Sequence, residues 1–330
     1  IIAPLRTLKK TGSTTCHQSR ILRDDPNKSI LLRQHNHWKD PSCCSHNSGS
    51  RMRITAGAVF AIAQTVFAAH EGSLESLEDF KGLFKVTPRI AAKAWNLLDR
   101  KGALPRYARP KHLLWTLYHM KCYDIEQVNK IFAGTTRKTF RKWVDIFVEL
   151  LADLEENLIR FDNRLINDNG APTKLTVDGT DFRSPEYSPF DPGRMSHKFA
   201  AAGFRYEVAI AIATGLICSI NGPFKCGNWP DLKIARDHLH EILPQGEYYL
   251  ADAGYRCQHS PSVTKFDIPA HEREDMDRLM AYHETINGKF KHWKILNDRF
   301  RGSENKHGGA FFAVAVLTQL EIAEGMHVWE

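Results

Sequence analysis

Apolar residues recur at helical spacing through the stretch 54–160. Between Leu77 and Leu98 they return every three or four residues, and Pro88 starts a second helix within that stretch. The segments 57–69 and 112–118 are similarly apolar. This pattern predicts a small helical region, residues 54–160, ahead of a second region of different character.

A helix-turn-helix pattern lies in the last third of that helical region. Residues 125–132 form a short amphipathic helix, 133–135 contain the turn glycine, and Thr136 is placed to cap a helix running to about Leu151. The second helix carries four basic residues near its start: Arg137, Lys138, Arg141 and Lys142. Because a recognition helix presents its N-terminal residues to the major groove, we predict DNA contact by these side chains. An ordinary solvated helix face is the alternative.

Strand patterns alternate with helix patterns from residue 171 onward. We expect a strand at 174–177, a hairpin of 206–213 and 216–220 turning at Thr214-Gly215, a helix at 231–243, and strands at 247–251 and 266–268. Two helices, 273–296 and 307–324, follow. This order predicts an α/β (α+β) fold: a mixed sheet with flanking helices in residues 171–330, as in the ribonuclease H-like fold.

Charge is distributed unevenly along the 330 residues. The whole chain has a net charge of +7, and residues 1–53 alone hold ten basic and three acidic side chains. Residues 161–330 hold 19 basic and 23 acidic ones. Basic segments attract phosphate backbones, whereas an acidic half needs bound cations or a locally basic rim to bind a nucleic acid. We predict a disordered basic tail in residues 1–53, because it lacks any apolar period.

The seven cysteines argue against a disulfide framework, since their number is odd and no CxxC pair occurs. A zinc site in the tail is an alternative use for some of them, but the spacing of its Cys and His residues matches no finger pattern. No apolar run has transmembrane length, and no secretory signal is visible. We therefore expect a soluble protein of a reducing, intracellular compartment, with no membrane partner.

Three carboxylates stand out by their context. Asp178 and Asp252 each follow an apolar strand and precede a nearby glycine, and Glu284 lies within the long helix 273–296. Carboxylates bind hard divalent cations such as Mg²⁺ and Mn²⁺, and two such ions can cut a phosphodiester bond. Taken singly, each residue is more often a turn, cap or solvated surface group. Their order along the chain makes a joint metal site a hypothesis worth testing.

The region from Val177 onward resembles DDE-type transposases and the DDE superfamily endonucleases, in particular the Harbinger-like transposase-derived nucleases. The resemblance covers roughly residues 171–325, and no single motif decides it, whereas five in the right order are strong. The matching pieces are Val177-Asp-Gly-Thr180, Ser196-His-Lys198 with Arg205-Tyr-Glu207, Gly222-Pro-Phe224 with Gly227-Asn-Trp-Pro-Asp231, Ala251-Asp-Ala-Gly-Tyr255, and His283-Glu-Thr-Ile-Asn287 with Lys291.

The resemblance implies a role for each acidic residue. Asp178, Asp252 and Glu284 become the catalytic carboxylates, and together with Asp231 they become ligands of two Mg²⁺ or Mn²⁺ ions. Asp231 either assists or replaces Asp252; its alternative is a helix N-cap after Pro230. The implied activity is metal-dependent cutting, and joining, of DNA strands. A catalytically silent, domesticated DNA-binding protein is the rival function.

The resemblance also implies partners and a location. Lys198, Arg205 and Lys291 are expected to contact DNA phosphates, or else to be solvated. The substrate would be double-stranded DNA at transposon ends or sites derived from them. A Myb-like helper protein and a homo-oligomer are compatible with the family, and the expected location is the nucleus.

Overall fold

The computed structural model describes residues 53–67 and 74–325. The predicted tail of residues 1–53 therefore lies almost wholly outside the described residues, as do its Cys and His residues. The described chain from Arg53 onward belongs to one compact unit. None of its helices is both long and apolar enough to cross a membrane.

Helices make up the first part of this unit. Three of them begin after residues whose hydroxyl accepts a hydrogen bond from the first turn: Ser76 from Asp79 N, Thr87 from Ile90 N, and Thr136 from Thr139 N. On the helix that follows Thr136, the apolar face that includes Phe140 and Phe147 is buried, as its spacing predicts. The helices are α1 (Ala56–Phe67), α2 (Leu77–Phe84), α3 (Pro88–Arg100), α4 (Pro110–Cys122), α5 (Glu126–Phe132), α6 (Arg137–Ala152) and α7 (Glu155–Leu158).

A mixed sheet forms the centre of the second part. Strand β1 pairs with β3 in the antiparallel and with β5 in the parallel direction; β4 pairs antiparallel to β3, and β6 parallel to β5. The short β2 pairs with the beginning of β3. The strands are β1 (Thr173–Arg183), β2 (Met195–Ser196), β3 (Ala201–Ala211), β4 (Ile217–Lys225), β5 (Tyr248–Ala251) and β6 (Ser262–Val263).

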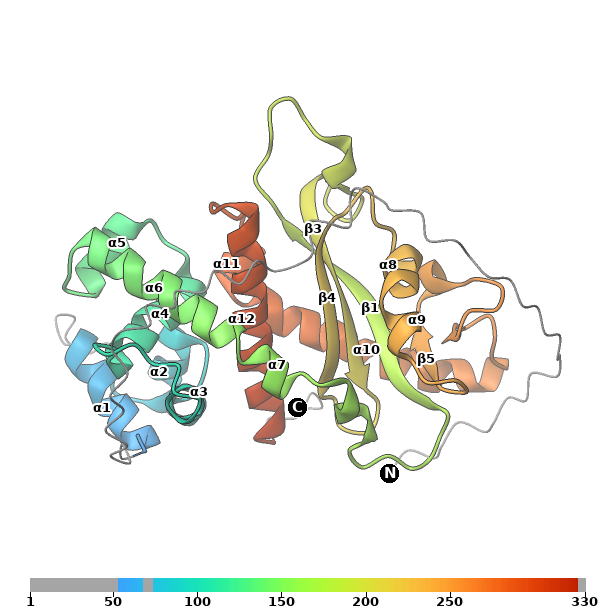
Figure 1. The fold of residues 1–330 in the computed structure, drawn as a ribbon, viewed down its shortest axis with the longest axis horizontal. Coiled ribbons are helices and arrows are strands. Elements are labelled where there is room, and N and C mark those ends of the chain that lie inside the picture. Colours follow the sequence, from blue (N-terminus) through green and yellow to red (C-terminus); the bar gives the residue numbers. More distant parts are fainter. Residues whose placement is uncertain (1–52, 68–73, 326–330) are drawn as a thin grey trace, which may run out of the picture. The chain divides into compact units, whose positions relative to one another are not determined.

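Helices flank this sheet on both faces (Figure 1). One face of β1 packs with α8 and α9 in a small core that includes Val177, Ala235 and Leu239. The other face packs with α12 in the large core, where the Tyr206 and Phe311 rings stack with centroids 3.8 Å apart. The remaining helices are α8 (Asp231–Asp237), α9 (Leu239–Ile242), α10 (Arg273–Lys291), α11 (Lys294–Asn297) and α12 (Glu304–Ala323), with short 3₁₀ turns η2 (Phe161–Leu165), η3 (Pro192–Arg194), η4 (Ala253–Tyr255) and η5 (Ala270–Glu272).

The predicted α/β class with a mixed sheet and flanking helices is confirmed, with four local corrections. Strand β1 does not end before Asp178 but continues to Arg183. The helix predicted for 231–243 is divided in two at His238. Residues 266–268 lie in a turn, and the last strand is β6 instead. The helix predicted for 273–296 ends at Lys291 and is followed by the separate α11.

The helical region and the sheet region, which the sequence predicts as separate, pack against each other through α12. Helix α12, from the end of the chain, packs against α6 as well as against the sheet. The side chains from Ala310 to Ile322 are all buried. The described helices and sheet thus share one large core.

Several core histidines are neutral at pH 7, and His307 is the most deeply buried. Burial lowers its pKa to about 3 from the usual 6.5, and its Nδ1 lies 2.7 Å from the Tyr206 hydroxyl. A folded-state pKa below the unfolded one gives stability that is complete above about pH 6.5 and is lost as the pH falls towards 3. Each such group costs about 1.4 kcal/mol per pH unit in that window.

We therefore expect His307→Gln to flatten the dependence of stability on pH. The variant is less stable than the wild type at pH 7 but loses less stability between pH 6.5 and 4.5, measured by urea unfolding at each pH. His271→Gln, at a side chain that is 80% exposed, serves as the control and follows the wild-type curve. Parallel curves for His307→Gln and the wild type would contradict the prediction.

Candidate functional site

Strand pairing brings Asp178 and Asp252 to neighbouring positions. In the parallel pair of β1 and β5, Val177 is the partner of Ala251, so the next residue on each strand is an aspartate. Adjacent strands lie about 4.8 Å apart. Beyond Ala251 the chain leaves the sheet, and the Asp252 carboxylate accepts a hydrogen bond from Gly254 N at 2.8 Å at the start of η4. The first two predicted carboxylates therefore lie side by side.

The side chain of Asp178 lies on the face of β1 that α10 covers. Its Oδ1 accepts from Gly179 N at 2.8 Å, and its Oδ2 accepts from Asn287 Nδ2 on α10 at 3.3 Å. Sequence reasoning included Asn287 in a motif but gave it no role. Its position three residues after Glu284 was the available signal, because residues three apart share a helix face.

Asp231 approaches the same place from the opposite side of β1. It is the first residue of α8, and a Cβ added to Gly179 would lie 2.2 Å from its Oδ1. Only a glycine in the strand leaves room for this carboxylate. The Oδ2 of Asp231 would lie 3.5 Å from a Cβ at Gly254, whose other neighbour is Asp252 Oδ1 at 3.0 Å. The N-cap alternative for Asp231 is wrong, because Pro230 holds the cap position and no side chain bonds there.

Glu284 stands one helical turn before Asn287, on the exposed side of α10. This spacing directs it to the same helix face as the asparagine that reaches Asp178. Lys291, seven residues further along α10, is exposed on that face too. No hydrogen bond or ion pair holds the Glu284 carboxylate to another described residue.

A buried ion pair supports the aspartates from beneath. Arg205 on β3 donates from Nε and Nη2 to the two carboxylate oxygens of Asp181 at 2.7 and 2.9 Å, and its Nη1 lies 3.2 Å from Asp231 Oδ1. Ser196 adds a third hydrogen bond to Asp181 at 2.6 Å. Because the Arg205 side chain is only 9% exposed and engaged in this way, the structure favours an internal positioning role over the phosphate contact expected from the sequence.

Burial and the repulsion between neighbouring carboxylates raise the pKa values of Asp178 and Asp231. Burial raises the pKa of Asp178, an effect that the charge of Lys198 opposes and that of Asp252 increases. Burial also raises the pKa of Asp231, opposed by Arg205 and Lys198 and increased by Asp178 and Asp252. A bound cation would relieve this repulsion. Lys198 reaches the cluster from an exposed segment, and its Nζ donates to Gly179 O at 2.6 Å.

Glu207 is a further carboxyl, which the sequence analysis included in a motif but to which it gave no role. It lies 3% exposed on β3, opposite Gly179 in the register, and burial raises its pKa to about 8, with the charge of Asp231 adding to the effect. It is therefore largely protonated at pH 7. Tyr255 is fully buried, and its hydroxyl tends to lower the pKa of Glu207.

The residues expected to contact DNA through the helix-turn-helix are all exposed at the start of α6. Arg141 makes a two-pronged contact with the Glu126 carboxylate of α5, and Arg137 lies 3.8 Å from it. This one acidic residue partly neutralises the arginines, whereas Lys138 and Lys142 contact no carboxylate among the described residues. The predicted groove contact stays a prediction.

The donor set fits hard divalent cations in its chemistry. All four candidate ligands are carboxylates, the ligand type that hard divalent cations prefer. The buried Asp231 Oδ1 accepts no hydrogen bond, and Arg205 Nη1, 3.2 Å away, is its ion-pair partner. Within the described part of the chain, no three His, Cys, Asp or Glu side chains stand close enough to form a ready-made metal site. In the present arrangement Asn287, Arg205 and backbone amides hold the aspartate oxygens instead.

Comparison with family models, with curated proteins and with solved structures finds no match to this chain.

Proposed function

We propose that this protein is a metal-dependent DNA endonuclease of the DDE transposase type. The observation that carries the proposal is the approach of Asp178, Asp231 and Asp252, from β1, α8 and the end of β5, to one place at the sheet. Glu284 on α10 supplies the third catalytic carboxylate. Asp231 serves as a further metal ligand, and Lys198 and Lys291 contact phosphates at the rim.

The order of elements supports the ribonuclease H-like fold and the Harbinger-like assignment. The elements follow one another along the chain as a long strand, a hairpin, a helical segment, two more strands and a long helix. The sequence analysis linked this order of elements to the ribonuclease H-like fold. The helices before the sheet then correspond to a helix-turn-helix-like DNA-binding region, with α6 as its recognition helix. Action on double-stranded DNA in the nucleus follows from the same assignment.

The mechanism needs no covalent enzyme nucleophile. Asp178, Asp231, Asp252 and Glu284 would hold two divalent cations, which when bound would supply an activated water and charge stabilisation for the departing oxygen of the phosphodiester. Asp178 is held rigidly by Gly179 N and Asn287 for this task. Arg205 fixes Asp231 at the opposite side. Lys198, at the Gly179 carbonyl, is positioned to attract the scissile phosphate to the cluster.

The test is nicking of a supercoiled DNA duplex by the purified full chain with Mg²⁺, with Mn²⁺ and with EDTA. We expect cutting that requires the metal and that disappears in Asp178→Ala purified in parallel. Parallel assays on single-stranded RNA distinguish a DNA endonuclease from a metal-dependent nuclease that cuts RNA instead. If a folded wild type cuts no duplex with either metal, or Asp178→Ala cuts equally well, the proposal fails. The domesticated, catalytically silent DNA-binding protein then becomes the better function.

A further inference from the structure

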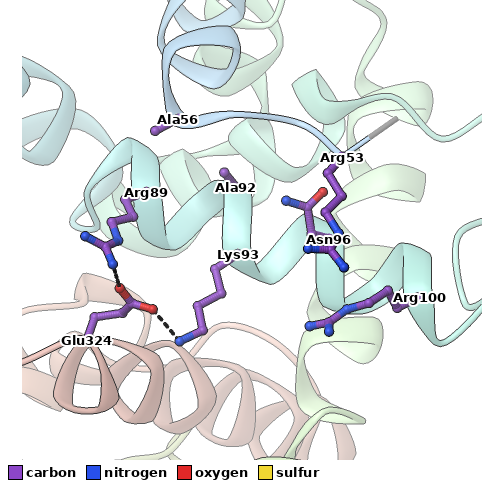
Figure 2. Close-up of a pocket in the computed structure, with 8 residues that line it drawn as sticks. All are labelled: Arg53, Ala56, Arg89, Ala92, Lys93, Asn96, Arg100 and Glu324. Carbon is purple, nitrogen blue, oxygen red and sulfur yellow. Dashed lines mark hydrogen bonds and ion pairs between the residues drawn. The ribbon is translucent and has the colours of Figure 1, made fainter. Parts of the chain in front are cut away.

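A second site lies far along the chain from the carboxylates, in a pocket of about 270 Å³ between α1, α3 and the end of α12 (Figure 2). Its wall on α3 is a single helix face, since Arg89, Lys93, Asn96 and Arg100 follow one another at intervals of four, three and four residues. The small side chains of Ala56 and Ala92 leave the space between these polar groups open.

The pocket concentrates positive charge that its own carboxylate does not balance. Four of its lining residues are basic and one, Glu324, is acidic. Glu324 lies 2.5 Å from both Arg89 Nη2 and Lys93 Nζ, and these contacts lower its pKa, chiefly through the hydrogen bond from Lys93. At the other end of the pocket, Arg53 and Arg100 contact no carboxylate of the described chain.

The fold fixes the backbone beside one of these two arginines. Asn96 accepts a hydrogen bond from Ile54 N at 3.0 Å and donates one to Ile54 O at 2.9 Å, which fixes the backbone next to Arg53. Helix α1 begins two residues later, at Ala56, so its positive N-terminal end adds to the field in the pocket. Clustered cations held without a counter-ion form a binding site for an oxyanion.

We propose that this pocket binds a phosphate group, with Arg53 and Arg100 as its principal ligands and Lys93 completing the site when Glu324 turns away. Arginine suits this role because its planar donors match two phosphate oxygens at once. The Glu324 carboxylate occupies Lys93 and Arg89 in the absence of such a ligand and competes with it. The phosphate belongs either to a nucleic-acid backbone or to a free phosphate compound, and the site is independent of the proposed cutting activity.

Calorimetric titration of the full chain with inorganic pyrophosphate tests the site. We expect Arg53→Gln and Arg100→Gln each to weaken binding about tenfold, the effect of losing one charge-assisted hydrogen bond. Glu324→Gln should strengthen binding several-fold, because it removes the competing carboxylate. Arg160→Gln, at an exposed arginine paired with Asp162, is the charge-matched control and should bind like the wild type.

Asn96→Ala separates a built site from general surface charge. It leaves the net charge unchanged but releases the backbone beside Arg53, and we expect it to weaken pyrophosphate binding. Absence of binding to the wild type would overturn the proposal. So would binding that follows net charge alone, with Asn96→Ala like the wild type and Arg160→Gln as weak as Arg100→Gln.

A second arm identifies the source of the phosphate. A short DNA duplex is titrated into the wild type and Arg100→Gln, with and without pyrophosphate. Competition between duplex and pyrophosphate, with weaker duplex binding and a smaller salt dependence in Arg100→Gln, supports the site and assigns it to a nucleic-acid backbone. Loss of pyrophosphate binding with unchanged duplex binding supports the site and assigns it to a free phosphate compound.

Discussion

Replacing Glu284 by glutamine is expected to reduce metal-dependent DNA nicking by more than about 100-fold, because even outer partners of metal ligands are worth about 10- to 100-fold. The substitution keeps the size of the side chain and removes only the charge that holds the cation. Since Glu284 is exposed and makes no hydrogen bond or ion pair with another described residue, we expect the fold to be unaffected. The measurement is the initial nicking rate at saturating Mn²⁺, together with the midpoint of thermal unfolding.

Glu274→Gln is the matched control on the same helix. Glu274 is also an exposed glutamate of α10, but it lies in the first turn, ten residues before Glu284. We expect it to nick at the wild-type rate. Equal rates for Glu284→Gln and Glu274→Gln would remove Glu284 from the catalytic set and would leave the three aspartates as the candidate metal ligands.

Replacing Arg205 by methionine is expected to lower the free energy of unfolding by about 3–5 kcal/mol, the usual cost of leaving one partner of a buried ion pair alone. The Asp181 side chain is 1% exposed. Burial alone would raise the pKa of Asp181, and the hydrogen bonds from Arg205 and Ser196 outweigh that effect and lower it. Without the guanidinium, the buried carboxylate must either stay charged at high cost or take up a proton.

A double-mutant cycle separates this cost from lost packing. Adding Asp181→Asn to Arg205→Met should recover part of the lost stability at pH 7, since the remaining side chain is then uncharged. Urea unfolding of the wild type, both single variants and the double variant gives the coupling free energy. If Arg205→Met lowers the free energy of unfolding by less than about 1 kcal/mol, the loss is in the range of exposed ion pairs. That result would contradict the prediction that the buried Arg205–Asp181 pair stabilises the fold strongly.

The fold class was predictable because apolar periodicity is local information. The helices α2 to α6 begin and end close to the expected residues, and the hairpin of β3 and β4 turns where Thr214-Gly215 indicated. The length of β1 was not predictable, since its continuation through Asp178 and Asp181 depends on partners in β3 far along the chain. Polar residues in mid-strand resemble a strand end when only the sequence is considered.

The candidate site was predictable in its carboxylates but not in their support. Strand-end context selected Asp178 and Asp252, which the register indeed makes neighbours. The pairing of Arg205 with Asp181 needed the strand register, because a sequence cannot tell a solvated arginine from a buried one. The role of Gly179 likewise required the position of Asp231 across the strand.

Helix α12 couples the stability of the helical region to that of the sheet. Because its side chains from Ala310 to Ile322 are buried by α6 on one side and by the sheet on the other, removing either region would expose an apolar helix. We therefore expect residues 53–325 to unfold in a single cooperative transition. Under the proposed function, a duplex bound at α6 would meet the carboxylates at an angle that this shared core sets.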